Sequence, residues 1–227
     1  MPLKSQPPIL YLITSGETTP ESNPASKDFA QVLNLIEAAV TAKVNLLQLR
    51  EKNLSARVLY ELTEQGAKLV KDSHTQMLVN DRADIACAAG ADGVHLTTQS
   101  LNARVVRNVY GSEFVIGVST HSQSEIEIAW NESATFAVYG PVFETSSKRS
   151  YGQPLGIASL RSSVSHVRPF PVLAIGGVTL DNVGDCFRAG AVGVAAIRLF
   201  QDPKALGTVV ERIREVFAEI YSHGSAN

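Results

Sequence analysis

Several short apolar segments of this chain end in side chains that can bind anions or move a proton. Ser119 and His121 follow Val115–Val118, and a longer polar set follows Phe136–Tyr139: Glu144, Thr145, Ser146, Ser147, Lys148 and Arg149. Cations and hydroxyls form strong hydrogen bonds with phosphate oxygens, and a histidine exchanges protons near neutral pH. These residue types predict a site for a charged small molecule. For the second set, a solvated surface loop is the alternative, because loops are commonly polar and exposed.

A further pair of cations comes at the end of the segment Val44–Leu49. Side chains alternate along a strand, so Gln48 and Arg50 would point inward from one face while Leu49 faces the helices. Lys52 would lie just beyond the strand. A charge inside a protein is costly unless it is paired or binds a ligand. We therefore expect Arg50 and Lys52 to bind an anion. An ion pair between Arg50 and Glu51 is the alternative.

Asn80 and Asp81 follow the next short apolar segment, Met77–Val79. Asn80 could contact a polar edge of a ligand. Asp81 could hold Mg²⁺, which usually takes one or two carboxylates together with phosphate oxygens. Asp81 could equally cap a helix over Arg82–Ala89, because aspartate is a favoured N-cap residue. The spacing leaves both interpretations open.

A phosphate site is predicted near the C-terminal end of the chain. Gly176 and Gly177 follow the segment Pro171–Ile175, and paired glycines let backbone N–H groups approach a phosphate closely. The next apolar segment, Gly193–Ile197, leads to Arg198. A tight turn before a helix is the alternative for the two glycines.

These residues must be positioned by strands that alternate with helices. The expected strands are Ile9–Thr14, Val44–Leu49, Met77–Val79, Gly93–Leu96, Val115–Val118, Phe136–Tyr139, Pro171–Ile175 and Gly193–Ile197. Amphipathic segments between them predict helices over Phe29–Ala42, Ala56–Lys71, Ala83–Ala89, Leu101–Val109, Ser124–Trp130, Ile157–Val164, Leu180–Ala189 and Pro203–Tyr221. Eight such repeats in 227 residues predict an α/β fold, a single-domain (β/α)8 TIM barrel over residues 1–227 with its core at about 9–222. An open doubly wound sheet is the alternative.

Composition and charge narrow the classes of partner. The net charge of −2 indicates no basic surface for nucleic acid or an anionic membrane, so local groups must bind any anion. The two cysteines, Cys87 and Cys186, are expected to be buried and reduced, and their spacing indicates neither a metal site nor a disulfide framework. No apolar run reaches the ~18 residues of a membrane helix. We expect a soluble cytoplasmic protein that acts on small molecules; a homo-oligomer is left open.

With these residues in view, the chain resembles the thiamine phosphate synthase family, whose close relatives include the thiazole tautomerases. The matching motifs cover about residues 10–200: YLIT at 11–14, QLREK at 48–52, VNDRADIA at 79–86, GADGVHL at 90–96, GVSTHS at 117–122, YGPVFETSSK at 139–148, AIGGVT at 174–179 and GAVGVAAI at 190–197. Each motif alone is weak. Together they give strong support for the fold and the superfamily.

The resemblance implies a transferase that joins a hydroxymethylpyrimidine diphosphate to a hydroxyethylthiazole phosphate and releases pyrophosphate. The pyrimidine diphosphate contacts would be Gln48, Arg50, Lys52, Asn80, Ser119 and Lys148. Mg²⁺ would be held by Asp81. The thiazole phosphate contacts would be Thr145, Ser147, Gly177 and the backbone of Ile197 and Arg198. Arg50, Ser119 and Lys148 would act in catalysis.

One position departs from the pattern of the synthases. In those enzymes an aspartate after the fourth strand supplies a second Mg²⁺ ligand, and here the residue is Ser100. Two alternatives therefore stay open. In the first, the chain is a thiazole tautomerase, with His121 as the acid and base that aromatises a thiazole carboxylate phosphate. In the second, it is a phosphate-binding barrel without catalytic activity.

Overall fold

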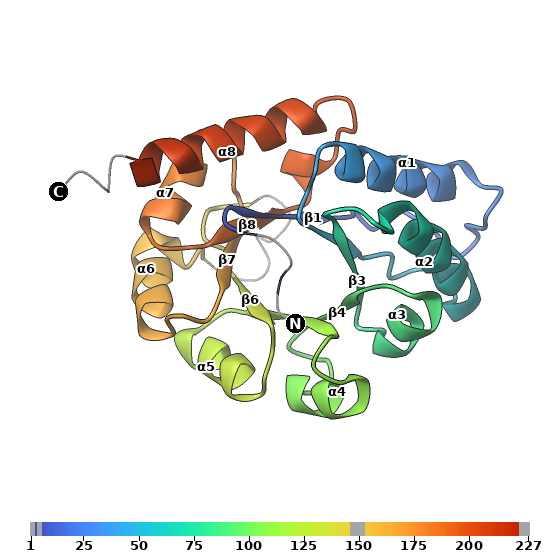
Figure 1. The fold of residues 1–227 in the computed structure, drawn as a ribbon, viewed down its shortest axis with the longest axis horizontal. Coiled ribbons are helices and arrows are strands. Elements are labelled where there is room, and N and C mark those ends of the chain that lie inside the picture. Colours follow the sequence, from blue (N-terminus) through green and yellow to red (C-terminus); the bar gives the residue numbers. More distant parts are fainter. Residues whose placement is uncertain (1–2, 4–5, 146–152, 223–227) are drawn as a thin grey trace.

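The computed structural model describes residue 3 and residues 6–145 and 153–222, and eight parallel strands in these ranges close into a barrel (Figure 1). The strands pair in chain order, and β8 closes the barrel on β1 through partners such as Tyr11 and Ala195. The strands are β1 Ile9–Ile13, β2 Leu46–Leu49, β3 Gln76–Asn80, β4 Gly93–Leu96, β5 Val115–Thr120, β6 Phe136–Tyr139, β7 Val172–Ile175 and β8 Gly193–Ala196. The closed barrel confirms the predicted fold and excludes the open sheet.

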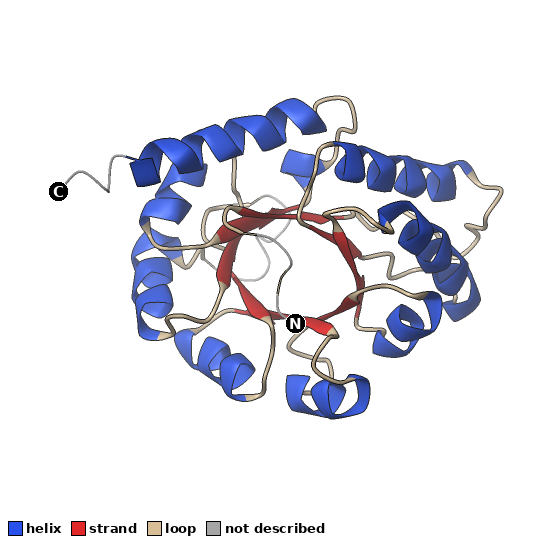
Figure 2. Cartoon of the chain, in the orientation of Figure 1, coloured by secondary structure: helices blue, strands red, loops and turns tan. Residues whose placement is uncertain are grey.

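Helices follow the strands and form a ring outside the barrel (Figure 2). They are α1 Lys27–Thr41, α2 Ala56–Val70, α3 Ala83–Ala89, α4 Ala103–Tyr110, α5 Gln123–Asn131, α6 Gly156–His166, α7 Val183–Arg188 and α8 Leu206–Ser222, with a short 3₁₀ helix, η2 Arg198–Phe200, before α8. This arrangement places the carboxyl ends of all eight strands, and the loops after them, at one mouth of the barrel.

Side-chain alternation divides the strand residues between two cores. Leu47 and Leu49 face outward and join the cluster that packs beneath the helices. Tyr11 and Leu78 face inward and belong to the cluster that fills the barrel. Both faces are buried because helices cover the outside and side chains fill the inside, which explains the continuous apolar strands. The expectation that Leu49 faces the helices is confirmed.

Several expected boundaries differ from the structure by one to three residues. β5 runs to Thr120, because Ser119 and Thr120 continue the ladder opposite Val138 and Tyr139 of β6. Ser119 therefore belongs to a strand instead of the loop after it. The last two helices begin later than predicted, α7 at Val183 and α8 at Leu206.

One cysteine prediction is wrong. Cys186 is buried, but Cys87 is exposed. The buried residues of α3 are Ile85, Ala86 and Ala89, so Cys87 falls on the opposite side of this short helix, facing solvent. Within the described ranges, no helix has the length and apolar character needed to cross a bilayer.

Candidate functional site

A row of hydrogen bonds links the ends of β2 and β3 at the mouth of the barrel. Gln48 Nε2 donates to Asn80 Oδ1 at 2.9 Å, and Asn80 Nδ2 donates to Asp81 Oδ2 at 2.9 Å. Gln48 and Asn80 are buried, whereas Asp81 is exposed. The row therefore begins inside the barrel and ends at a carboxylate that a ligand or cation can reach.

The Asp81 carboxylate accepts hydrogen bonds from hydroxyl groups in the loop after β4. Thr97 Oγ1 donates to Asp81 Oδ1 at 3.4 Å, and the Ser100 hydroxyl donates to the same oxygen. Asp81 adopts the left-handed conformation with φ of 58°, which is uncommon outside glycine and tolerated by aspartate. The helix-capping interpretation of Asp81 is not supported, because α3 begins at Ala83 after Arg82, without a side-chain cap.

This oxygen-rich set is suited to a hard cation. Mg²⁺ binds oxygen ligands and commonly uses only one or two carboxylates, with substrate phosphates and water completing its shell. Asp81 offers the carboxylate, and Thr97 and Ser100 offer hydroxyls. No cluster of three or more His, Cys, Asp or Glu suited to a metal occurs among the residues that the structure describes. The donor set therefore fits a cation that arrives with a phosphate-bearing ligand.

Arg50 is a half-buried cation beside this row, just past the end of β2. Its guanidinium passes close to Gly16 of the loop after β1, since a Cβ placed on Gly16 would lie 3.3 Å from one terminal nitrogen. Among the described residues, no acidic side chain lies within ion-pair distance of Arg50. Lys52 is exposed two residues further along. Both cations are thus available to an anion at the mouth.

Glu51 does not pair with Arg50, so that structural alternative is wrong. The Glu51 carboxylate is buried and accepts hydrogen bonds from the hydroxyls of Thr14 and Thr18 and from the Thr18 backbone N–H. Neither threonine was among the predicted site residues. Their signal was weak, because threonines after a first strand are common in turns.

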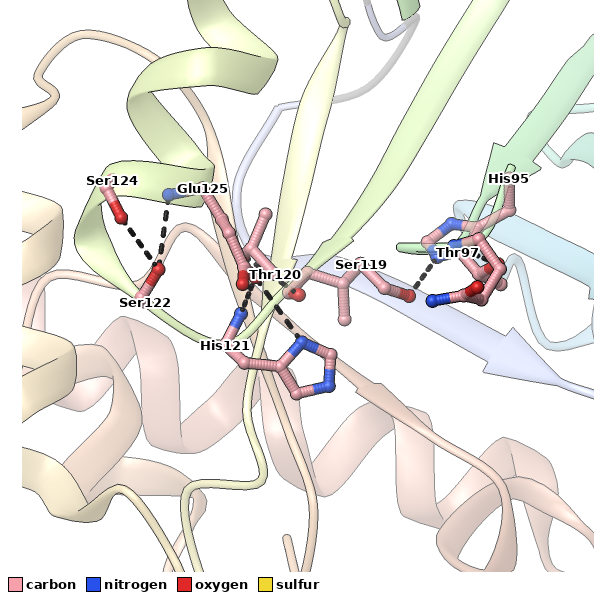
Figure 3. Close-up of polar contacts among 10 residues, drawn as sticks. His95, Thr97, Ser119, Thr120, His121, Ser122, Ser124 and Glu125 are labelled. Carbon is pink, nitrogen blue, oxygen red and sulfur yellow. Dashed lines mark hydrogen bonds and ion pairs between the residues drawn. The ribbon is translucent and has the colours of Figure 1, made fainter. Parts of the chain in front are cut away.

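Ser119 faces His95 across the ladder between β4 and β5. Ser119 Oγ lies 2.9 Å from His95 Nε2 (Figure 3), and the Tyr11 hydroxyl lies 3.1 Å from His95 Nδ1. His95 is buried, and desolvation lowers its pKa to about 4 in spite of the opposing effect of Asp81. Sequence reasoning missed Tyr11, although its place between Ile9 and Ile13 on one face of β1 was a usable signal.

His121 comes directly after the end of β5, two residues beyond Ser119, and has different partners. Its imidazole turns toward Glu125 of α5, with Nδ1 3.5 Å from Oε2, while Ser119 points toward His95 (Figure 3). The Glu125 carboxylate also accepts the backbone N–H of His121 at 2.6 Å. The structure therefore groups Ser119 with the barrel interior and His121 with the first turn of α5.

The predicted phosphate residues lie at the ends of β7 and β8. Ile175 pairs with Ala195, so Gly177 and Ile197 come two residues beyond a shared ladder pair, with Arg198 next. Gly177 has a φ of +64°, and a Cβ there would lie 2.4 Å from the Glu144 carbonyl oxygen. Glycine is therefore needed for the segment after β6 to approach this closely. Thr145, half-buried, belongs to that same segment.

Two predicted residues, Ser147 and Lys148, lie outside the described residues. The remaining predicted residues divide into two groups around the mouth. The group on β2, β3 and β5 or just after them is Gln48, Arg50, Lys52, Asn80, Asp81 and Ser119, and the group after β6, β7 and β8 is Thr145, Gly177, Ile197 and Arg198. This arrangement can hold two anionic groups side by side, one with a cation and one on backbone N–H groups.

Known proteins share both the sequence and the fold. A model of the thiamine monophosphate synthase family matches residues 10–200. A Geobacter sulfurreducens protein, provisionally named a thiamine-phosphate synthase, is 42% identical over 195 residues, which cover 86% of this chain and 87% of that protein. The thiamine-phosphate synthase of Roseiflexus castenholzii is 34% identical over 87% of this chain and 82% of its own.

A solved structure agrees with these relatives. The thiamine phosphate pyrophosphorylase of Pyrococcus furiosus superposes with a TM-score of 0.74 at 28% identity, over 93% of this chain and 96% of its own. The sequence match extends from β1 to the end of β8 and includes every strand end described above. This chain belongs to the thiamine monophosphate synthase family.

Proposed function

We propose that this chain is a thiamine phosphate synthase, a transferase that joins hydroxymethylpyrimidine diphosphate to hydroxyethylthiazole phosphate. In this reaction the C–O bond between the pyrimidine methylene and the diphosphate breaks, and its electron pair leaves with pyrophosphate. The thiazole nitrogen then gives its lone pair to the methylene carbon. The family supports the reaction, and the observation that carries it is Arg50, a cation with no acidic partner among the described residues, at the end of the strand that neighbours the strand before Asp81.

Arg50 and Lys52 bind the diphosphate in this proposal. Negative charge grows on the bridging oxygen as the bond breaks, and pre-positioned cations stabilise it without reorganising in the transition state. The row Gln48, Asn80 and Asp81 fixes the polar edge of the pyrimidine beside them. Lys148 adds a further positive charge to the diphosphate.

Mg²⁺ would be held by Asp81, with the hydroxyls of Thr97 and Ser100 close by. Bound there, it would neutralise part of the charge of the diphosphate. Ser100 in place of a second carboxylate lowers the negative charge of the ligand set. Affinity for the cation then depends more on the diphosphate itself.

The thiazole phosphate binds at the other side of the mouth, on Thr145, Ser147, Gly177 and the backbone of Ile197 and Arg198. Loops after the seventh and eighth strands commonly bind phosphate in barrels of this kind. Holding both reactants at one mouth turns a bimolecular encounter into a reaction between positioned groups. The proposed location in the cell is the cytoplasm, supported by the water-soluble nature of both substrates.

The direct test is to incubate the chain with the pyrimidine diphosphate, the thiazole phosphate and Mg²⁺. We expect thiamine phosphate and pyrophosphate in equal amounts, and Arg50→Ala to reduce the rate strongly. The same chain is then given a thiazole carboxylate phosphate alone. Three results together would show that the proposal is wrong and that the chain is a tautomerase: the ring of the thiazole carboxylate phosphate is isomerised, His121→Ala stops this isomerisation, and no thiamine phosphate forms in the first mixture.

A further inference from the structure

A buried hydrogen-bond network of three side chains crosses the interior of the barrel and ends at the mouth. The Tyr11 hydroxyl on β1 contacts His95 Nδ1 at 3.1 Å, and His95 Nε2 on β4 contacts Ser119 Oγ on β5 at 2.9 Å. Tyr11 is 0% exposed and His95 is 2% exposed. Ser119 is half-buried and is the residue of this network that a ligand can reach (Figure 3).

The protons in this hydrogen-bond network have one favourable arrangement. Burial disfavours the charged forms of both side chains, and their hydrogen-bond partners are uncharged, so the phenol keeps its proton and the imidazole is neutral. A neutral imidazole donates from one nitrogen and accepts at the other. Among the described residues, His95 Nδ1 is the sole acceptor within reach of the Tyr11 hydroxyl.

If Nδ1 carried the proton, it would donate to Tyr11, and the buried phenol proton would then have no acceptor among the described residues. Leaving a buried donor unsatisfied costs more than a hydrogen bond gains. Tyr11 therefore donates to Nδ1, and His95 carries its proton on Nε2 and donates it to Ser119 Oγ. The hydroxyl proton of Ser119 then has no acceptor in the part of the chain that the structure describes, and it can be donated to a ligand at the mouth.

We propose that Tyr11 and His95 are positioning residues that fix Ser119 as a hydrogen-bond donor toward an anionic oxygen of the diphosphate. This inference rests on the proposed function, in which Ser119 contacts the pyrimidine diphosphate. A hydroxyl that donates to an anionic oxygen forms a short, charge-assisted bond, and the bond strengthens as charge develops on the leaving group.

Packing holds the imidazole in the orientation that this role requires. Phe136 contacts both rings, edge-on to Tyr11 at 5.5 Å between centroids and tilted against His95 at 6.2 Å. Gly117 leaves the space for them, because a Cβ there would lie 2.5 Å from Phe136 Cζ and 2.7 Å from His95 Nδ1. These contacts pack the ring of His95 between Tyr11 and Ser119, with one nitrogen facing each hydroxyl.

The tautomer is tested by nitrogen NMR of the full chain labelled with ¹⁵N-histidine, with the His95 signals assigned by their loss in His95→Gln. We expect His95 protonated on Nε2 and unprotonated on Nδ1, with and without added inorganic pyrophosphate. A proton on Nδ1 would overturn the proposal. This measurement does not depend on turnover, so it separates failure of this inference from failure of the proposed function.

A double-mutant cycle tests the coupling to catalysis. Tyr11→Phe keeps the ring against Phe136 but removes the donor, and we expect kcat to fall about tenfold with KM for the thiazole phosphate unchanged. In the Tyr11→Phe background, Ser119→Ala should cost much less than it does alone. Additive losses would overturn the proposal. Tyr139→Phe is the matched control, because this buried tyrosine also loses one hydrogen bond, to Ser159, but lies outside the site and should leave kcat unchanged.

Discussion

Thr18 donates two hydrogen bonds to the buried carboxylate of Glu51, from its hydroxyl at 2.6 Å and from its backbone N–H at 3.3 Å. The Thr14 hydroxyl donates to the same carboxylate and accepts the backbone N–H of Arg50 at 2.9 Å. Glu51 thus ties the loop after β1 to the end of β2. Arg50, the cation proposed to bind the diphosphate, is part of this connection through its backbone N–H.

Replacing Glu51 by alanine should destabilise the fold by about 2–4 kcal/mol, since buried hydroxyls lose a charged acceptor. Urea unfolding measures the loss. The control is Glu61→Ala on α2, which breaks an exposed pair with Arg57 at 3.0 Å and should change stability by about 0.5 kcal/mol or less. Equal losses in the two variants would show that the buried contacts of Glu51 contribute nothing beyond a surface pair.

Arg50→Ala should lower kcat/KM for the pyrimidine diphosphate roughly 10–100-fold, since charge-assisted hydrogen bonds contribute about 1.5–3 kcal/mol. Arg50→Lys should recover only part of this, because an ammonium keeps the charge but loses the planar fork. Steady-state kinetics with each substrate varied in turn gives the values. Arg57→Ala, an exposed arginine on α2, is the control and should be neutral. An unchanged Arg50→Ala enzyme would remove this residue from the proposed site.

Ser100→Asp should lower the Mg²⁺ concentration needed for half-maximal activity by roughly an order of magnitude, because the charge of the ligand set controls affinity. Without Mg²⁺ the new carboxylate would repel Asp81, whose oxygen now accepts the Ser100 hydroxyl. The melting temperature of the variant should therefore rise with added Mg²⁺ and pyrophosphate more than that of the parent. If the melting temperatures of the variant and the parent rise equally, Mg²⁺ does not bind at Asp81.

The stability of the fold should fall in acid because of His95. Its pKa is lowered to about 4 from the ordinary value of 6.5, chiefly by burial, so between these values the unfolded chain binds a proton that the folded chain does not. The contribution is complete above pH 6.5 and is lost toward pH 4, at up to about 1.4 kcal/mol per pH unit. Urea unfolding of the parent and of His95→Gln across this range measures it. The stability difference between them should shrink as the pH falls, and a constant difference would contradict the burial of a neutral imidazole.

Gly177→Ala should raise KM for the thiazole phosphate more than KM for the pyrimidine diphosphate. The positive φ disfavours alanine, and its Cβ would displace Phe143 or Glu144 from the loop after β6. Gly207→Ala on α8 is the control, because nothing lies within 4 Å of its added Cβ and alanine favours a helix by about 1 kcal/mol. Equal effects on the two KM values would argue against a thiazole phosphate site at Gly177.

The sequence by itself was enough for the fold. Alternation of short apolar segments with amphipathic ones predicts eight strand–helix repeats, and seven elements, including β4 and α3, have the predicted boundaries or differ by a single residue. Period two also placed Gln48 inside and Leu49 outside. These properties are local, because they depend on neighbours in the chain and on burial of one face.

Only the tertiary structure decided which polar groups contact one another. Glu51 binds Thr18 across 33 positions of sequence, and Tyr11 reaches His95 across 84. Such partners are set by the closure of the barrel, which brings β1 beside β2 and across from β4. The alternation of residues within a single strand does not predict these contacts. The pairing of β4 with β5 likewise brings Ser119 to His95, whereas the contact of His121 with Glu125 spans only four positions and is local.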